Sequence, residues 1–294
     1  MTTYAISAVT GRYGKVALQQ LLSNIQRGVG IADSGKDSVI ALARNVDKAS
    51  ASVPQGVEVR AADYSDPAQM VTALKGVDRL LFVSSQPGAA VPRLRQHQNV
   101  IDAAQKDGVS YIAYTSFAKA DSAKSPLAED HQGTEKALKA SGIRHSFLRN
   151  AWYLENDMAV FKGAAAGRPL VYSAGEGRVS WASEKDYAQA GANVLVEAEP
   201  AEVYEFGGTP RTFAQMAQEV EKVTGKHVDV KAVDDAGYEQ ALKDSGMDEG
   251  LAQVLTSFQT MMRAGELDVD SPDLENALGH APEPMSEALK NAIA

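Results

Sequence analysis

The first half of the chain alternates short apolar runs with longer segments of helical spacing. The runs are continuous rather than alternating, which predicts strands buried on both faces of a parallel sheet. A repeated strand–helix order of this kind predicts an α/β fold with a Rossmann-like, doubly wound sheet. The expected strands are Tyr4–Val9, Val39–Arg44, Val57–Asp63, Arg79–Ser85, Tyr111–Ser116 and Arg144–Asn150, with helices at Pro67–Leu74, Val91–Asp107 and Gly133–Ser141.

The second half of the chain has a more mixed pattern. The run RPLVYSAGEGRVSWAS has the character of a hairpin, with Gly175 and Gly177 as turn residues. An amphipathic helix is expected in RTFAQMAQEVEKVTG, and the tail from Asp234 to Ala294 is predicted to be largely helical and acidic. The second half therefore favours a smaller, mostly helical lobe.

These patterns suggest a division into two parts. Residues 1–150 are expected to form the Rossmann domain, and residues 151–294 a smaller lobe. Some segments, about 178–208, are expected to return to the Rossmann domain. The polar stretch Ser23–Ser38 is long for a connection between a helix and a strand, where ~2–6 residues are usual, and it predicts a mobile surface loop.

Composition narrows the function classes. The net charge of −9 disfavours nucleic acid as the main partner, because a phosphate backbone needs a basic face. The chain has no cysteine, so disulfides and thiolate catalysis are excluded. There is no signal-peptide pattern and no run long enough to span a membrane, so a cytoplasmic protein without a membrane span is expected.

The turn after the first expected strand has a dinucleotide-binding pattern with one member replaced. It reads Ala8-x-x-Gly11-x-x-Gly14, with alanine where the first glycine would stand. Gly11 and Gly14 keep the roles of phosphate approach and helix packing, and the helix start still offers free N–H groups to an anion. The pattern favours nucleotide binding; the alternative is a glycine turn without a ligand.

The ends of the next two strands indicate which dinucleotide is bound. A protein selecting NAD tends to have an acidic residue at the end of the second strand, but here Arg44 stands there and Lys48 follows. A guanidinium suits the 2′-phosphate of NADP; the alternative is a surface cation. Asp63 is placed for an adenine amino group, or else it caps the following helix.

The usual proton donor of alcohol dehydrogenation is missing. None of the 10 tyrosines has lysine at the fourth position after it, and Gln132 stands where the tyrosine paired with Lys136 would be. A substrate that accepts hydride without a donated proton, such as a quinone, fits better. His131 lies near the expected nicotinamide end; the alternative is that it caps or packs the helix start.

Metal and nucleophile chemistry find no support in the sequence. The histidines show no paired metal-ligand spacing, and there is no Gly-x-Ser-x-Gly elbow. No metal site is therefore expected. The five histidines are His97, His131, His145, His227 and His280.

Several stretches together resemble one family over nearly the whole chain. They are AVTGRYG, VIALARNVDKA, GVEVRAADYSDP, GVDRLLFVSS, GVSYIAYTSFAKAD, PLAEDHQGTEKALKASGI and FLRNAWYLEN. The chain is similar to the NmrA-like branch of atypical short-chain dehydrogenases, above all to its bacterial type-two NADPH:quinone oxidoreductases and triphenylmethane reductases. It departs from the family turn, Thr-Gly-Ala-Thr-Gly, at Ala8, and its Ser23–Ser38 loop is longer.

The resemblance implies NADPH at the carboxyl ends of the strands and a quinone beside the nicotinamide. Residues 1–150 are therefore expected to bind NAD(P), and the lobe of residues 151–294 the substrate. The resemblance implies that the cofactor is bound by Gly11, Arg12, Tyr13, Gly14, Arg44, Lys48, Ser84, Ser85, Thr115 and Ser116. Thr10 and Asp63 are further expected cofactor contacts. The resemblance also implies a substrate wall of Asn150, Trp152 and Tyr153. Catalytic roles are expected for His131, Lys136, Asn150 and Tyr153.

Two functions remain open at this point. The first is an NADPH-dependent reductase of quinones or similar electron-poor aromatics, in which catalysis comes mainly from positioning. The second is a non-catalytic NADP(H) sensor that binds a protein partner, because the missing Tyr–Lys pair fits it equally well. The family often forms dimers, so a homodimer is a further expectation.

Overall fold

The computed structural model describes residues 1–293 of the 294-residue chain. These residues form two compact units, which are described separately below. The first unit comprises Met1–Asn150, Glu184–Tyr204 and Asn276–Gly279. The second comprises Ala151–Ser183, Glu205–Glu275 and the described residues from His280 to Ile293.

A seven-stranded sheet forms the centre of the first unit, with the strand order β10-β6-β5-β4-β1-β2-β3. The pairs from β3 across to β6 are all parallel. The order reverses between β1 and β4, which is the switch point of a doubly wound sheet. The predicted α/β Rossmann-like fold is thus confirmed. The strands are β1 (Thr3–Ile6), β2 (Ser38–Ala43), β3 (Glu58–Ala61), β4 (Arg79–Phe82), β5 (Tyr111–Phe117), β6 (Arg144–Asn150) and β10 (Val203–Phe206).

Several strands end earlier than their apolar runs predict. β1 stops at Ile6 rather than Val9, and β4 stops at Phe82 rather than Ser85. In both cases the chain leaves the sheet to form the turn or segment that faces the ligand pocket described below. Ala8 from the first run and Val83, Ser84 and Ser85 from the other therefore line the pocket.

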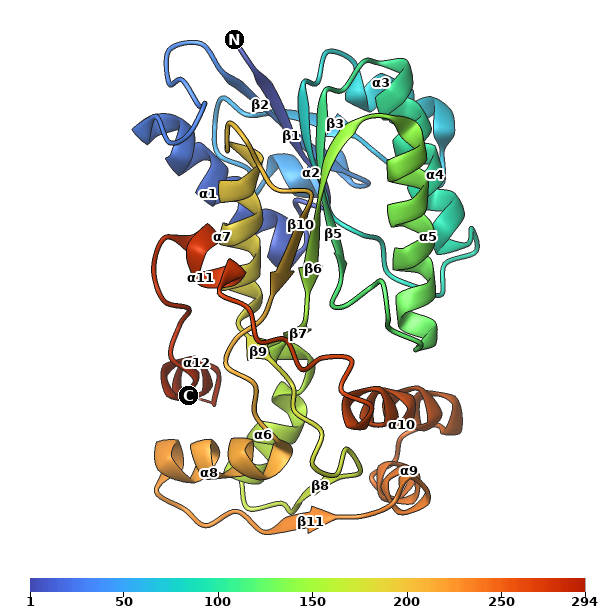
Figure 1. Cartoon of the computed structure of the whole chain (residues 1–294), viewed down its shortest axis with the longest axis vertical. Helices are drawn as coiled ribbons and strands as arrows, with labels where there is room; N and C mark the ends of the chain where they lie inside the picture. The colour runs from blue at the N-terminus through green and yellow to red at the C-terminus, as the bar shows by residue number, and fades with distance from the viewer. Residues whose placement is uncertain (294) are drawn as a thin grey trace. The chain divides into compact units, whose positions relative to one another are not determined.

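Helices cover both faces of this sheet. Figure 1 shows α1 and α7 on one face and α3, α4 and α5 on the other. Sequence signals fix some of the helix ends: Asp66 caps α3 by accepting the N–H groups of Ala68 and Gln69, and Pro67 follows in the first turn. The helices are α1 (Arg12–Arg27), α2 (Val46–Ser50), α3 (Pro67–Leu74), α4 (Arg93–Lys106), α5 (Pro126–Ser141) and α7 (Glu184–Leu195).

The predicted loop Ser23–Ser38 is wrong in its first part. α1 continues through Ser23 to Arg27 and ends at Gly28, which takes the left-handed conformation (φ +65°). Beyond it, the Ile31 N–H donates to the Val196 oxygen at 2.9 Å. Main-chain bonds therefore hold the segment against the end of α7 rather than leaving it as a free loop.

The second unit contains short strand pairs and helices. The predicted hairpin around Gly175 and Gly177 is wrong: β8 pairs in parallel with β11, and β9 pairs in parallel with β7. Both strands find their partners in distant parts of the chain. The elements are β7 (Trp152–Tyr153), η1 (Leu154–Asn156), α6 (Met158–Ala165), β8 (Leu170–Tyr172), β9 (Trp181–Ala182), α8 (Phe213–Thr224), β11 (Val230–Ala232), α9 (Asp235–Asp244), α10 (Glu249–Arg263) and α12 (Met285–Ile293). The short helix α11 (Asp273–Leu278) begins in the second unit and ends in the first.

Aromatic rings form the core of the second unit. Phe213 at the start of α8 lies edge-on to Trp181, with ring centroids 5.2 Å apart, and stacks on Tyr172 at 5.4 Å. Such contacts bury large apolar areas in a small unit. Within residues 1–293, no helix combines the length and apolar character needed to cross a membrane.

Candidate functional site

A pocket of about 610 Å³ lies at the carboxyl ends of the first four strands of the sheet. Doubly wound sheets bind their ligands at this edge, beside the point where the strand order reverses. The walls come from the turn after β1, the ends of β2 and β3, the segment after β4 and the start of α7. Residues that line it include Ala8, Gly11, Gly14, Arg44, Asp63 and Ser84.

Ala8 opens the glycine turn in the left-handed conformation, with φ +56°. The Gly11 N–H closes the turn on the Ala8 oxygen at 2.9 Å. A Cβ atom on Gly14 would overlap the main-chain oxygens of Ala8 and Ser7, so the helix can pack on the turn only if this residue is glycine. The turn therefore keeps its glycine shape, and the alanine bears the strain.

The start of α1 offers binding groups for an anion. Gly11 at its N-cap has no side chain to satisfy the free N–H groups, and the first turn has no acidic residue. Instead, the Tyr13 N–H donates to the Glu184 carboxylate at 3.0 Å, and the Arg12 Nε lies 2.9 Å from the other carboxylate oxygen. N–H groups at a helix start beside a guanidinium are typical of phosphate sites.

The residues predicted for the pyrophosphate, Thr10–Gly14, all line this pocket. The Tyr13 side chain, however, is buried, and its hydroxyl donates to the main-chain oxygen of Tyr187 in α7 at 3.0 Å. A Cβ atom on Gly191 would collide with that hydroxyl. Tyr13 therefore anchors α1 to α7, while its main-chain N–H points to the Glu184 carboxylate.

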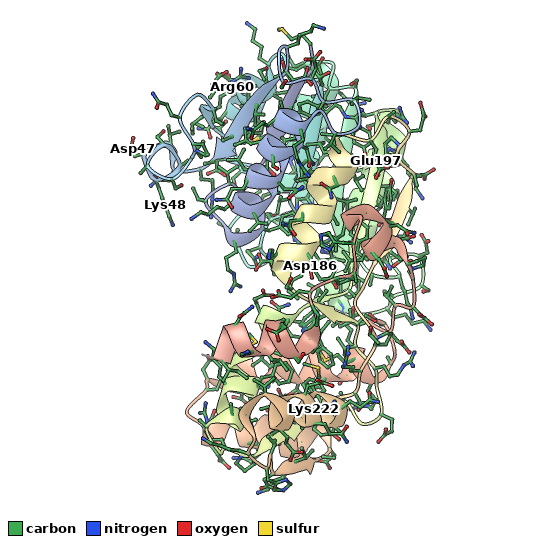
Figure 2. The ribbon with its side chains drawn as sticks, turned by 90° about the vertical axis from the view of Figure 1, so that its left-hand side faces the viewer. Asp47, Lys48, Arg60, Asp186, Glu197 and Lys222 are labelled. Atoms are coloured by element: carbon green, nitrogen blue, oxygen red, sulfur yellow. The ribbon has the colours of Figure 1, made fainter. Side chains whose placement is uncertain are left out.

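Arg44 and Lys48 differ in their relation to the pocket. Arg44 follows β2, is exposed and lines the pocket. Lys48 lies on α2 beside Asp47 (Figure 2) and is exposed, but it is not among the lining residues. Asn45 caps α2 by accepting the Lys48 N–H at 2.8 Å, which places Lys48 in the first helical turn. A role of Lys48 in binding the 2′-phosphate stays a prediction.

Asp63 lines the pocket beyond the end of β3. The alternative that it caps the following helix is wrong, because Asp66 occupies the N-cap of α3. The Oδ1 of Asp63 instead accepts the Ser65 N–H at 2.8 Å and closes a local turn. This turn fixes the carboxylate at the pocket, and its contact with an adenine stays a prediction.

The segment after β4 is held from behind by two buried side chains. The Ser84 N–H donates to Thr115 Oγ1 at 2.8 Å, and the Ser85 N–H donates to His97 Nε2 at 3.0 Å. Burial, together with the nearby Arg93 charge, lowers the pKa of His97 to about 3, so its ring is neutral and can accept at Nε2. Thr115 thus contributes to the pocket through Ser84.

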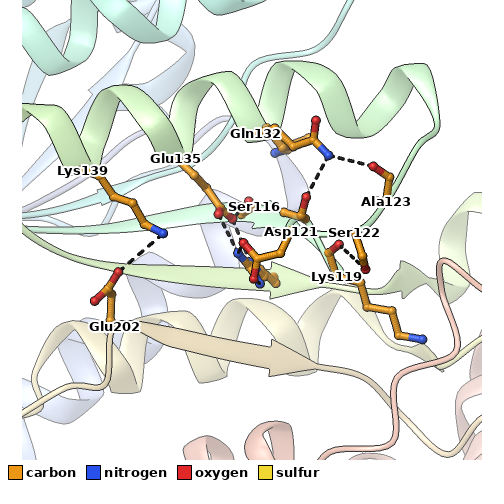
Figure 3. Close-up of polar contacts among 12 residues, drawn as sticks. Ser116, Lys119, Asp121, Ser122, Ala123, Gln132, Glu135, Lys139 and Glu202 are labelled. Atoms are coloured by element: carbon orange, nitrogen blue, oxygen red, sulfur yellow. Dashed lines mark hydrogen bonds and ion pairs between the residues drawn. The ribbon is translucent and has the colours of Figure 1, made fainter.

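A charge network with a buried Arg149–Glu135 pair and an exposed Asp121 lies beside the last residues of β5 (Figure 3). Arg149 pairs with both carboxylate oxygens of Glu135, at 3.0 and 2.7 Å, and with both of Asp121, at 2.8 Å each. Ser116 donates to Glu135 at 2.6 Å. Arg149 holds the pKa of Asp121 below its ordinary value. Ser116, predicted for the nicotinamide side, is therefore committed to this network, which sequence reasoning missed.

Gln132 holds the loop between β5 and α5. Its Nε2 donates to the main-chain oxygens of Ala120 and Ala123, at 2.8 Å each (Figure 3). The residue that replaces the tyrosine thus has a structural task. Lys136 lies one turn further along α5 and is exposed; its catalytic role stays a prediction.

His131 is buried in the first unit and is not among the lining residues of the pocket. Its Nδ1 lies 2.9 Å from the Tyr114 hydroxyl, and its ring packs against Phe117 with centroids 6.0 Å apart. Burial and the Arg93 charge hold its pKa well below 6.5, which keeps the ring neutral. This is a packing environment, and catalysis by His131 stays a prediction.

The residues predicted for the substrate wall belong to two units. Asn150 ends β6 in the first unit, is buried, and accepts the Ala118 N–H on its main-chain oxygen at 3.1 Å. Trp152 and Tyr153 form β7 in the second unit. Trp152 packs edge-on against Phe258 of α10, with centroids 5.4 Å apart.

Asp157 is a partly buried acid that sequence reasoning missed. Its Oδ2 accepts the indole N–H of Trp152 at 3.0 Å and that of Trp181 at 2.7 Å. Burial raises the pKa of Asp157 to about 6, although the two indole bonds favour the charged form. Across residues 1–293 there is no group of three or more acidic or histidine side chains that could hold a metal ion.

Comparison with known proteins gives a consistent result. A family model described as NAD(P)H-binding matches residues 9–195. Quinone oxidoreductase 2 of Escherichia coli K12 is 37% identical over 290 residues, which is 98% of this chain and 97% of that protein.

Solved structures match over similar lengths. A crystal structure of an Escherichia coli NADPH-dependent quinone oxidoreductase with NADPH aligns with a TM-score of 0.88 and 36% identity, covering 99% of this chain and 100% of the other. Triphenylmethane reductase from Citrobacter sp., complexed with NADP(H), aligns with a TM-score of 0.87 and 33% identity, covering 98% and 99%.

Proposed function

Because this chain belongs to the NAD(P)H-binding family, we propose that it is an NADPH-dependent reductase that transfers hydride to a quinone or a similar electron-poor aromatic acceptor. Its 37% identity to quinone oxidoreductase 2 of Escherichia coli, along almost the full length of both chains, supports this activity. The observation that carries the cofactor assignment is the pocket itself, which combines a glycine turn, a helix start and Arg44.

The pocket residues fit NADPH on structural grounds. The missing Cβ of Gly14 lets the helix start approach the turn, so the main-chain N–H groups at Arg12 and Tyr13 lie beside space for a diphosphate. Arg44 lines the pocket where an NAD-selective protein has a carboxylate, and its planar guanidinium suits a phosphate. Asp63 and Ser84 complete the wall. NADPH supplies the hydride when it is bound.

The chain contributes positioning rather than a proton. Gln132 has no acid–base chemistry, and its amide nitrogen is committed to two main-chain oxygens. The oxygens of a reduced quinone can collect protons from water, so the missing Tyr–Lys pair costs little for this acceptor. Fixed groups behind the pocket, such as Thr115 and His97, hold the lining segment in place.

The acceptor site belongs to the proposal as well. The roles of Asn150, Trp152 and Tyr153 in contacting the acceptor remain predictions. His131 and Lys136 remain catalytic candidates. His131 is buried and Lys136 is exposed, and for both we expect an indirect role. A cytoplasmic location and a homodimer also remain predictions.

The test is steady-state oxidation of NADPH by the purified chain with 1,4-benzoquinone, with NADH measured in parallel. We expect quinone-dependent loss of NADPH absorbance and a clear preference for NADPH over NADH. Gly14→Ala should abolish the activity because its methyl group displaces the turn, whereas Lys222→Ala, an exposed change on α8, should leave it unchanged.

Two other results would lead to different conclusions. Binding of NADPH without turnover of any simple quinone would favour the NADP(H) sensor over the reductase. Failure to bind NADPH at all would mean that the strained turn at Ala8 has lost its ligand.

A further inference from the structure

Among residues 1–293, the acidic side chains that line the pocket are Asp63 and Glu184. Glu184 is the first residue of α7, and its side chain is 12% exposed. One carboxylate oxygen accepts the Tyr13 N–H at 3.0 Å, and the other lies 2.9 Å from the Arg12 Nε. The carboxylate therefore holds two groups that suit the binding of a phosphate.

A carboxylate in this position stands in for a phosphate oxygen pair. The start of α1 has no side-chain cap and no acidic residue in its first turn, so its N–H groups and positive dipole end are unsatisfied by α1 itself. Glu184 lies 171 positions further along the chain than Tyr13. An anion is thus supplied to the helix start from α7.

We propose that Glu184 is an internal competitor for the diphosphate of the cofactor and sets the affinity of the pocket for NADPH. The inference rests on the proposed function. In the bound state the Glu184 carboxylate gives up the Tyr13 N–H, and Arg12 turns from Glu184 to the diphosphate. Arg12 is free to do so because its side chain is 71% exposed.

Charge explains why this competition weakens binding. A diphosphate brings negative charge to a pocket where the Glu184 carboxylate is mostly shielded from solvent, so the two anions repel each other. Glu184→Gln keeps the size of the side chain and an oxygen that can accept the Tyr13 N–H, but it removes the charge. The variant should therefore bind NADPH more tightly and hold the free helix start less well.

The experiment measures dissociation constants for NADPH by its fluorescence, at low ionic strength, in the wild type, Glu184→Gln and Glu184→Ala. We expect both variants to bind NADPH about tenfold more tightly, a change equivalent to about 1.4 kcal/mol. Glu199→Gln removes the same charge from a side chain that is 90% exposed and paired with Arg144, and it should bind NADPH as the wild type does.

Adenosine 2′-monophosphate is the second probe, because it carries the 2′-phosphate but no diphosphate. Its affinity should be the same in the wild type and in Glu184→Gln. Equal tightening for both ligands would overturn the proposal, since Glu184 would then act through its general field. Glu184→Gln should also unfold at a lower temperature than the wild type when no ligand is present, because α1 loses a charged partner.

Two outcomes separate this inference from the proposed function. If the wild type binds NADPH and Glu184→Gln binds it equally or less well, Glu184 is not a competitor, although the reductase function stands. If neither protein binds NADPH, the proposed function fails together with the inference.

Discussion

The main-chain oxygen of Ala8 occupies the space that a Cβ atom on Gly14 would need. This contact explains how a turn without its first glycine can still receive α1. Ala8 has taken the left-handed conformation, φ +56°, that a glycine would adopt without strain. The sequence departs from the dinucleotide-binding pattern, but the main chain does not.

Ala8→Gly should stabilise the protein. Removing the strain of the left-handed conformation should raise the free energy of unfolding by roughly 1–2 kcal/mol. The greater freedom of glycine in the unfolded chain should lower it by about half of that amount. We expect a net gain of roughly 0.5–1 kcal/mol, measured by urea unfolding monitored by circular dichroism. Gly76→Ala is the matched opposite change, because Gly76 also has positive φ (+73°) but lies outside the pocket. A loss of stability in Ala8→Gly would show that Ala8 is not strained.

Arg44→Ala should weaken the binding of NADPH much more than the binding of NADH. A guanidinium that pairs with the 2′-phosphate makes a charge-assisted contact worth roughly 1.5–3 kcal/mol, or about ten- to hundredfold in affinity. NADH lacks that phosphate and should lose little. Dissociation constants for both cofactors check this, with Lys48→Ala as the companion variant. Equal losses for NADPH and NADH would show that Arg44 does not bind the phosphate.

Asp157 should make the intrinsic fluorescence of the protein depend on pH. The chain has two tryptophans, and both donate their indole N–H to this carboxyl group. With the pKa of Asp157 raised to about 6, protonation should change the emission with a midpoint near pH 6. Asp157→Asn keeps an acceptor oxygen but does not titrate, so its emission should stay constant over that range. The same midpoint in Asp157→Asn would assign the titration to another group.

The same pKa shift has a consequence for stability. Because folding raises the pKa of Asp157 from 3.8 to about 6, the folded state binds the proton more tightly than the unfolded state. The contribution of the Asp157 carboxyl group to the free energy of unfolding is therefore fully present below about pH 4 and is lost as the pH rises through about 6. Asp157→Asn should gain stability relative to the wild type between pH 4 and pH 8, by at most about 3 kcal/mol. Urea unfolding of both proteins at pH 4 and pH 8 measures this gain. The same difference in unfolding free energy at both pH values would contradict the raised pKa of Asp157.

Arg149→Met should be strongly destabilising. It leaves Glu135, whose side chain is 6% exposed, without its guanidinium partner, and stranding one member of a buried pair costs about 3–5 kcal/mol. Arg144→Met breaks the exposed pair with Glu199 and should cost under about 1 kcal/mol. Measuring the free energy of unfolding of Arg149→Met and Arg144→Met tests this difference. Adding Glu135→Met to Arg149→Met should recover part of the loss, because the stranded charge is removed.

Much of the first unit could be predicted from the sequence because continuous apolar runs mark buried strands. The β6 range, Arg144–Asn150, and the α3 range, Pro67–Leu74, agree with the structure to the residue. The hairpin near Gly175 failed for a physical reason: β8 and β9 pair with strands distant in the chain, and local turn signals carry no information about such partners.

The pocket residues, too, could be predicted from the sequence only in part. Residues at strand ends, such as Arg44 and Asp63, could be placed at the pocket because parallel strands bring their carboxyl ends to one edge. Glu184 could not, since it arrives from a helix 171 residues away from the N–H group that it accepts. No local pattern indicates that the Ser116 hydroxyl donates to the buried Glu135 carboxylate.

A single-turnover experiment tests the central claim most directly. The protein, saturated with NADPH under anaerobic conditions, is mixed in a stopped-flow instrument with a limiting amount of 1,4-benzoquinone, and NADPH absorbance is followed. The account predicts that one NADPH is oxidised for each quinone reduced, much faster than without protein and faster than with NADH. Bound NADPH that stays reduced, or is lost only at the rate seen without protein, would contradict it.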